Sequence, residues 1–374
     1  MVAYFTIAFL AVFLALIPSN KKFGLNCAFL VITIFLAIRY KWGNDYVAYL
    51  EMYQNFNTAN FDLFDIEKNA ALRGGKEYGW VILNRLFGTL HLGFFGMIIV
   101  LTLFENWVIR RMIIRFVEPK SYWIAIAFYV FTTWFPTDAS MMRQYLCVCL
   151  YMLVVELMVD KKVRGYLFWA IGIIMLGTTL HLSNMITMAT LPAFYIHFKN
   201  NNKTYLLMVG IGIILFLWTT YGFQYIGSAL IQFMIADEGV RSYAIYAGEQ
   251  GGIANSGFGV FFSYIKLVIL LFILPKIAEK DKQSIILLVI VSYFIAAIGA
   301  VIPPAGRMML FFTVWEIVLW PWLFKFAKRH PWMFVVILAQ IIIMGKEITE
   351  FFYDPIWHDN FFEYHTIFEA PNWI

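Results

Sequence analysis

The chain has 374 residues, of which 62% are apolar, 19% are aromatic and only 14% are charged. Soluble domains carry charges at about one residue in four, so this composition excludes an ordinary soluble protein and indicates a polytopic membrane protein. The net charge of +5 arises mainly from Lys and Arg residues between apolar segments, so we interpret it as a topology signal and infer no nucleic-acid partner.

Apolar segments long enough to cross about 30 Å of hydrocarbon as helices recur along the chain. We predict an all-α protein with about twelve transmembrane helices in one integral membrane domain, residues 1–374. The first segment lacks the basic region and cleavage site of a signal peptide, so we expect it to be retained. The predicted spans are Val2–Ile17, Phe23–Ile38, Phe94–Ile109, Tyr122–Trp134, Met141–Val159, Tyr166–Thr179, Ser183–His197, Tyr205–Tyr221, Phe258–Leu274, Ser284–Ile302, Met308–Phe324 and Trp332–Met344.

Lys and Arg residues gather in every second connection between these spans, from Lys21 and Lys22 to Lys328 and Arg329. Short cytoplasmic loops are enriched in these residues, so this side is predicted to be cytoplasmic, with both termini outside. Three long loops fall on the external side. They cover about residues 39–93, 222–257 and 345–374. Long external segments commonly cover or form a site, so we expect the functional residues there.

The first external loop begins with RYKWGNDYVAYLEMYQ, directly after an apolar segment. Asn44 or Asp45 can cap a helix in which Tyr46 and Tyr49 lie on one apolar stripe. Such a helix would lie on the membrane surface, where tyrosines commonly act as anchors. Asp45 is a candidate for chemistry, because Asn44 could supply the cap. Further along, KEYGWVILNRLF is a second amphipathic segment and contains Glu77; most acids in this loop are expected to be solvated.

Arg39, Arg143 and Arg307 lie on the external side, against the usual bias of basic residues. Arg143 and Arg307 also begin helices, where the helix dipole disfavours a cation, so an anionic partner is expected. Backbone N–H groups and a guanidinium together suit phosphate oxygens. The alternative is an internal salt bridge, for which Asp138 is the obvious partner of Arg143.

His181, in GTTLHLSNM, lies in a short external hairpin. Its ordinary pKa near neutrality makes it a candidate general base, and a structural role is the alternative. Arg241 and Lys41 are weaker candidates for anion binding, because both could lie in water. Lys266 falls inside a predicted span and has no evident role.

The remaining polar residues predict no metal and no cofactor. The external segment HDNFFEYH lacks a helical metal-ligand spacing, and the first loop has no paired-acid motif. The cysteines fall inside predicted spans with no disulfide or metal spacing, so we expect them to pack in the core. They are Cys27, Cys147 and Cys149.

Read in order, five segments resemble the EpsG-type family of bacterial polysaccharide polymerases, which is related in function to the Wzy-type O-antigen polymerases. These are AIRYKWGNDYVAYLEMY, EYGWVILNRLF, DASMMRQYLCVCLYML, TTLHLSNMITM and AGRMMLFFTVWEIVLWPW. The first fits the family pattern of Arg, then Gly-x-Asp-Tyr, then Tyr, with Asn44 where Thr is commoner. The pair Arg143 and Gln144 and the pair His181 and Ser183 also fit.

The resemblance implies a GT-C-like membrane glycosyltransferase in the cytoplasmic (inner) membrane, with its active site on the outer (periplasmic) face. Such an enzyme transfers a glycan from an undecaprenyl-diphosphate-linked donor to the non-reducing end of a lipid-linked repeat unit. The implied partners are these two lipid-linked oligosaccharides, membrane lipid and a chain-length regulator.

Under this resemblance, external arginines would stabilise the leaving diphosphate without a metal. These are Arg143, Arg307 and Arg39. His181 and Asp45 are both candidates for the base that activates the acceptor hydroxyl, and His181 is favoured because capping can explain Asp45. Direct displacement would invert the anomeric centre. The residues expected to contact substrate are Tyr46, Tyr49, Gln144, Arg241 and Glu77.

Three other activities have to be weighed. A lipid-linked glycan flippase or transporter would be expected to carry charges at mid-helix positions and two related halves, and the sequence shows neither apart from Lys266. A glycan ligase uses the same chemistry with a different acceptor, so the sequence separates it poorly from a polymerase. A membrane O-acyltransferase would be expected to hold its His well inside the membrane, unlike the external position predicted for His181.

Overall fold

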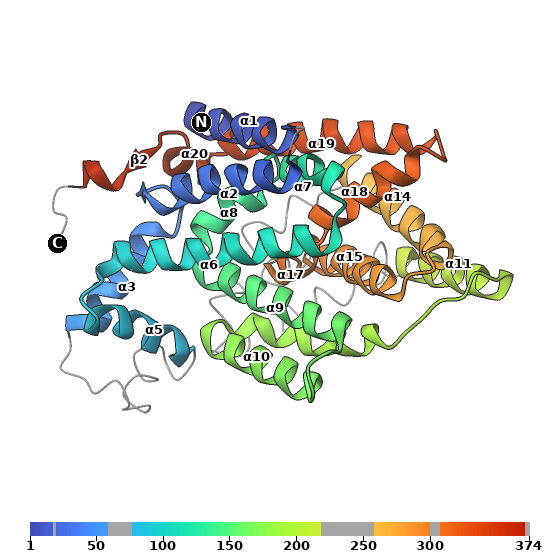
Figure 1. Ribbon diagram of the computed structural model, residues 1–374, viewed down its shortest axis with the longest axis horizontal. Coiled ribbons are helices and arrows are strands. Elements are labelled where there is room, and N and C mark those ends of the chain that lie inside the picture. The colour runs from blue at the N-terminus through green and yellow to red at the C-terminus, as the bar shows by residue number, and fades with distance from the viewer. Residues whose placement is uncertain (18–19, 59–76, 218–257, 300–306, 371–374) are drawn as a thin grey trace. The chain divides into compact units, whose positions relative to one another are not determined.

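The computed structural model describes residues 1–17, 20–58, 77–217, 258–299 and 307–370. The chain divides into two compact units: the first consists of Met1–Met185 with Glu316–Ile374, and the second of Ile186–Trp315. Both units are built almost entirely of helices, which confirms the predicted all-α class (Figure 1).

The first unit contains the residues that position the candidate site. Its elements are α1 (Val2–Leu16), α2 (Lys21–Ala37), β1 (Arg39–Tyr40), α3 (Tyr46–Thr58), α5 (Tyr78–Thr89), α6 (Gly93–Phe116), η1 (Pro119–Ser121), α7 (Tyr122–Val130), α8 (Trp134–Ser140), α9 (Met142–Asp160), α10 (Tyr166–Leu180), α18 (Glu316–Ala327), α19 (Met333–Tyr353), α20 (Pro355–Phe361), β2 (His365–Thr366) and η5 (Ile367–Glu369). The 3₁₀ helix η2 (Leu182–Phe194) begins in this unit.

Five helices of this unit pack in a row, in the order α1, α2, α6, α9 and α10 (Figure 1). Small side chains bring the first two close together, since Ala8, Ala11 and Ala15 recur at three- and four-residue spacing and are all buried. At its start, α2 is capped by Asn20, whose side chain accepts a hydrogen bond from the backbone N–H of Phe23 at 3.0 Å.

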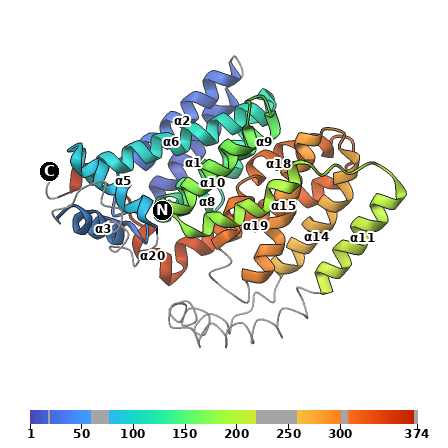
Figure 2. The same ribbon diagram turned by 90° about the horizontal axis from the view of Figure 1, so that it is seen from below.

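In the parts of the first predicted external loop that the structure describes, residues 39–58 and 77–93, most residues belong to the helices α3 and α5. These helices pack on each other, and α5 also packs on α6 and α10 (Figure 2). The chain bends by 118° between α5 and α6. His91 (φ 54°) and Gly93 (φ 68°) both adopt the left-handed conformation there, which glycine tolerates without strain. Helix α3, which begins at Tyr46, confirms the helix predicted after Asp45.

The C-terminal segment is tied to the beginning of the first loop. Strands β1 and β2 pair antiparallel, with Arg39 opposite Thr366 and Tyr40 opposite His365. The Trp42 Nε1 group donates a hydrogen bond to the Phe361 carbonyl oxygen at 3.1 Å. This pairing fixes the turn that leads into α3.

The predicted spans differ from the helices in several places. Helix α7 ends at Val130, so Tyr122–Trp134 is not one helix. Ser183–His197 corresponds to a 3₁₀ helix that contains Pro192, whose missing N–H is incompatible with a regular α-helical ladder. Met308–Phe324 is divided between α17 and α18. Helix α19 continues to Tyr353, so part of the predicted external loop 345–374 is helical.

Within the described residues, one helix is long and apolar enough to cross a membrane, Met142–Asp160, and the bent pair α5 and α6 passes the same test if it is taken as a single span. Several other helices are apolar but shorter, such as α1 and α10 with 15 residues each. The number of twelve spans therefore stays a prediction.

The second unit contains η4 and four described helices. They are α11 (Asn202–Leu217), α14 (Phe258–Ile273), η4 (Leu274–Lys276), α15 (Lys280–Gly299) and α17 (Leu310–Thr313). Helix α14 packs on α11 and α15. Lys266, which had no evident role in the sequence, lies over the ring of Tyr293 at 5.1 Å from Nζ to the centroid, a cation–π contact that helps to hold α14 on α15.

Candidate functional site

Glu77 immediately precedes α5 and points into the first unit. Its backbone is left-handed (φ 55°, ψ 37°), which costs a non-glycine residue about 1 kcal/mol, and its side chain is only 12% exposed. Gly79 brings the start of α5 onto the end of α10, because a Cβ at this position would lie 2.2 Å from the Thr179 Oγ1 atom. This close approach aims Glu77 at the loop that follows α10.

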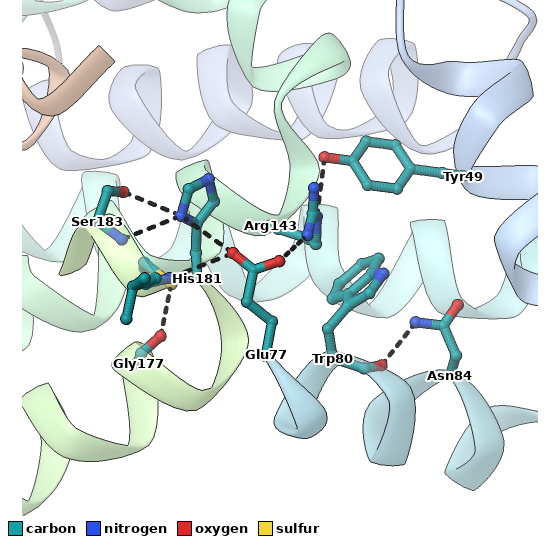
Figure 3. Close-up of polar contacts among 10 residues, drawn as sticks. Tyr49, Glu77, Trp80, Asn84, Arg143, Gly177, His181 and Ser183 are labelled. Atoms are coloured by element: carbon teal, nitrogen blue, oxygen red, sulfur yellow. Dashed lines mark hydrogen bonds and ion pairs between the residues drawn. The ribbon is translucent and has the colours of Figure 1, made fainter. Parts of the chain in front are cut away.

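Arg143 lies in the first turn of α9, as predicted, and its side chain is 15% exposed. Its Nη1 group forms an ion pair with Glu77 Oε2, and its Nε group donates to the Tyr49 hydroxyl at 3.4 Å (Figure 3). The guanidinium also lies over the Tyr49 ring, with Cζ 5.6 Å from the centroid. The alternative of an internal salt bridge for Arg143 is therefore confirmed, but its partner is Glu77 and not Asp138, which accepts a hydrogen bond from the Tyr129 hydroxyl at 3.4 Å.

His181 follows the last residue of α10, where the chain becomes extended (φ −151°, ψ 120°). Its Nδ1 atom lies 3.5 Å from Glu77 Oε1 and 3.0 Å from Ser183 Oγ (Figure 3). The same Glu77 oxygen accepts a hydrogen bond from the Leu182 backbone N–H at 3.2 Å. Glu77 thus joins the beginning of α9 to the end of α10.

The aromatic side of this cluster is formed by α3 and α5. The rings of Tyr49 and Trp80 meet edge to face, with centroids 5.5 Å apart. Burial raises the pKa of Tyr49, and the nearby charge of Arg143 opposes this only in part, so the phenol stays neutral at physiological pH. Tyr49 therefore supports Arg143 as a hydrogen-bond acceptor and an aromatic face.

The other candidates of the first loop lie elsewhere in this unit. Asp45 is exposed, and its backbone N–H donates to Ser140 Oγ at 3.3 Å. Tyr46 is fully buried and packs edge-on against Phe94 with centroids 5.4 Å apart, so it stabilises α3 against α6. Gln144 is also buried.

Arg39 is 2% exposed and points into the protein interior. Its Nη1 group donates hydrogen bonds to the Leu36 carbonyl oxygen and to Thr102 Oγ1, the latter at 3.1 Å. The structure therefore separates Arg39 from the cluster around Arg143. Arg307 is exposed and belongs to the second unit, and its role stays a prediction. Arg241 lies outside the described residues.

Glu77 is the residue whose importance the sequence understated. The sequence predicts only a substrate contact for Glu77, in a loop whose acids are mostly expected to be solvated. In the structure, Glu77 contacts both Arg143 and the hairpin of His181. Its partners are 66 and 105 residues away in the chain, so no local spacing could have revealed them. In the described part of the chain, no group of three or more His, Cys, Asp or Glu side chains is placed to hold a metal ion.

The opposite end of α9 carries a different kind of polar surface. Arg111 and Arg115 of α6 form ion pairs with Glu156 and Asp160 of α9, at 2.7 Å and 2.5 Å respectively. Such exposed pairs contribute little to stability, about 0 to 1 kcal/mol each. They do show that the C-terminal ends of α6 and α9 lie side by side, one helix length away from Arg143.

An apolar helical chain with a partly buried Arg, Glu and His cluster at helix ends defines a membrane protein with a polar site at the boundary of its helical core. The comparison with protein families is more specific. The chain belongs to the EpsG family, whose model matches residues 22–366, and the members of this family are polysaccharide polymerase-like proteins. No curated protein and no solved structure shows significant similarity to the chain.

Proposed function

We propose that this protein is a polysaccharide polymerase of the outer face of the cytoplasmic membrane. It transfers a glycan from an undecaprenyl-diphosphate-linked donor to the non-reducing end of a lipid-linked repeat unit, with inversion and without a metal. Membership of the EpsG family supports the general class. The meeting of Arg143, Glu77 and His181 supports the chemistry and is the observation on which the proposal rests.

In this reaction a hydroxyl oxygen of the acceptor attacks the anomeric carbon of the donor. The bond from that carbon to the diphosphate oxygen breaks, and the diphosphate leaves with the electron pair. Arg143 is assigned to the developing negative charge, because a guanidinium offers several donors to phosphate oxygens and a partly buried site screens its charge weakly. The apolar lipid chain of the carrier stays in the membrane.

His181 is assigned to the proton of the acceptor hydroxyl. The Glu77 carboxylate next to Nδ1 stabilises the positive charge that the imidazole acquires when it takes this proton. Asp45 is exposed at the start of α3 and is assigned to acceptor binding.

The outer location is supported by the distance between the two ends of α9. Its 19 residues span about 28 Å, close to the thickness of the hydrocarbon core. Arg143 is at one end, and the basic residues expected on the cytoplasmic side are at the other. The cluster would then lie at the outer membrane boundary, where a lipid-linked diphosphate resides.

The test is polymerisation by the purified full-length protein in lipid nanodiscs, with lipid-linked repeat units as donor and acceptor. Loss of one such charge-stabilising donor or of the base typically costs about a hundredfold in rate. We expect that effect for Arg143→Ala and for His181→Ala. Arg164→Ala and His358→Ala replace exposed residues of the same types and serve as matched controls.

Wild-type rates for both site variants would refute the assignment of these residues. A wild-type protein that moves lipid-linked units across a bilayer without joining them would instead be a flippase. Transfer of the glycan to a different acceptor, with no lengthening of repeat units, would identify a ligase.

A further inference from the structure

Glu77 uses its two carboxylate oxygens for two different partners. Oε2 contacts Arg143 Nη1 in an ion pair, while Oε1 lies 3.5 Å from His181 Nδ1 and accepts the Leu182 N–H at 3.2 Å (Figure 3). The contact with Arg143 is the closer of the two side-chain contacts. One negative charge is therefore shared unequally between a permanent cation and a titratable imidazole.

This sharing matters because all three side chains are largely removed from water. The exposed fractions are 15% for Arg143, 12% for Glu77 and 20% for His181. Charges in such surroundings interact more strongly than on an open surface, and an opposite charge within about 4 to 6 Å changes proton affinity substantially. A change in the charge that surrounds Arg143 must consequently change the proton affinity of the His181 imidazole.

We propose that Glu77 is a positioning residue that couples diphosphate binding at Arg143 to the basicity of His181. In the free protein the Glu77 carboxylate is neutralised mainly by Arg143. When a diphosphate engages Arg143, the carboxylate is less neutralised and its charge acts on His181, so the imidazole becomes a stronger base only when a donor is bound. This inference rests on the function proposed above.

The proton balance follows directly. The acceptor hydroxyl proton moves to His181 as the new glycosidic bond forms, and the imidazolium pairs with Glu77. When the diphosphate leaves, Arg143 pairs with Glu77 again, and the imidazolium releases its proton to water. An empty site thus holds a weaker base, which lowers its ability to activate water.

The coupling can be measured without turnover. The full-length protein with ¹⁵N-labelled histidine is titrated by NMR in nanodiscs, with and without inorganic pyrophosphate, and the His181 signal is identified by its loss in His181→Ala. In the wild type we expect saturable pyrophosphate binding that raises the titration midpoint of His181 by about one pH unit, a tenfold gain in proton affinity.

Three variants separate coupling from a direct effect of the bound anion. Glu77→Gln keeps the shape of the side chain but removes its charge, so the pyrophosphate-induced change should fall to the small direct contribution. Glu51→Gln removes the same charge from an exposed position of α3 and should behave as the wild type. Glu77→Asp retains the charge on a shorter side chain and should keep part of the change.

The outcomes distinguish the inference from the proposed function. Binding that depends on Arg143 but leaves the His181 midpoint unchanged would overturn the coupling and leave the polymerase assignment standing. A full change in Glu77→Gln would also overturn it. Absence of binding, or binding that Arg143→Ala does not weaken, would overturn the coupling together with the assigned diphosphate site.

Discussion

Among single residues, three buried ionisable groups stand out in the interior of the first unit, apart from the cluster around Arg143. Arg39 is 2% exposed, and Glu105 and Asp138 are 1% exposed each. Glu105 and Asp138 interact electrostatically, and two such carboxylates removed from water repel each other, so we expect one of them to carry a proton. The Tyr129 hydroxyl donates to Asp138, which favours the ionised form of Asp138, so we expect the proton on Glu105. With Arg39, the group is then neutral.

The protonation of this pair predicts an asymmetric response to amide substitutions. Glu105→Gln replaces a neutral donor by another and should leave the unfolding temperature in detergent nearly unchanged. Asp138→Asn removes the negative charge that neutralises Arg39, and we expect it to lower the free energy of unfolding by about 3 kcal/mol. Thermal unfolding of the two purified variants measures this. The opposite order of stability would assign the proton to Asp138 instead.

The candidate site was only partly foreseeable at this scale. Arg143 and His181 could be selected because an external cation at a helix start and a hairpin histidine are local anomalies. Arg39 also looked like a cation on the external side, yet it lies in the interior with Thr102. Whether an arginine faces solvent or protein depends on the neighbouring helices, and its own sequence segment does not contain that information.

At the scale of elements, the packing of α5 on α10 sets the position of Glu77. Gly79→Val would place a side chain where the Thr179 side chain and its backbone carbonyl carbon lie, at 2.2 Å and 3.0 Å from the added Cβ. We expect the start of α5 to move away, with at least a tenfold loss of polymerisation, since small displacements at a reacting site are costly. Gly172→Ala is the control: Gly172 lies in α10, the helix on which α5 packs, but nothing lies within 4 Å of the added Cβ, so this variant should remain active.

Loss of activity can be assigned to the site only if the variant is folded. The elution volume in size-exclusion chromatography and the unfolding temperature in detergent are therefore compared between the variants and the wild type. A folded Gly79→Val protein with full activity would show that the geometry around Glu77 is unimportant for the reaction.

The C-terminal element offers a prediction about pH. The His365 side chain and the backbone N–H and hydroxyl of Thr366 donate hydrogen bonds to Glu369, and they hold the pKa of this carboxyl below its usual value. A carboxyl whose pKa is lowered on folding stabilises the structure above its unfolded value of about 4.5, and this contribution disappears as the pH falls.

We therefore expect the segment from β2 to η5 to detach from β1 at acidic pH. Amide hydrogen exchange at Ile367, whose N–H donates to the Ile38 carbonyl oxygen at 2.8 Å, should accelerate when the pH falls below about 4.5, after correction for intrinsic rates. Glu369→Gln should already show this faster exchange at neutral pH. Equal protection in both proteins at every pH would contradict the assigned role of Glu369.

For the whole molecule, the proposed function predicts how the helices are oriented in the membrane. The proposed outer site predicts that α3 faces the outside and that the connection between α9 and α10 faces the cytoplasm. In a protein without its native cysteines, Glu51→Cys should react in intact cells with an impermeant maleimide, whereas Lys162→Cys should react only after permeabilisation. Both positions are exposed. The reverse labelling pattern would place the cluster of Arg143 and His181 on the cytoplasmic side.

The class of the molecule follows from its amino-acid sequence alone. Its apolar composition required burial of most side chains in lipid or in a helical core, and the order of its motifs indicated the EpsG family. Helices such as α9 and α3 could be located because the length of an apolar segment and the periodicity of apolar residues are local properties of the sequence. The contacts by which Glu77 joins Arg143 to His181, and the interior position of Arg39, become visible only in the folded chain, because they join residues far apart in the sequence.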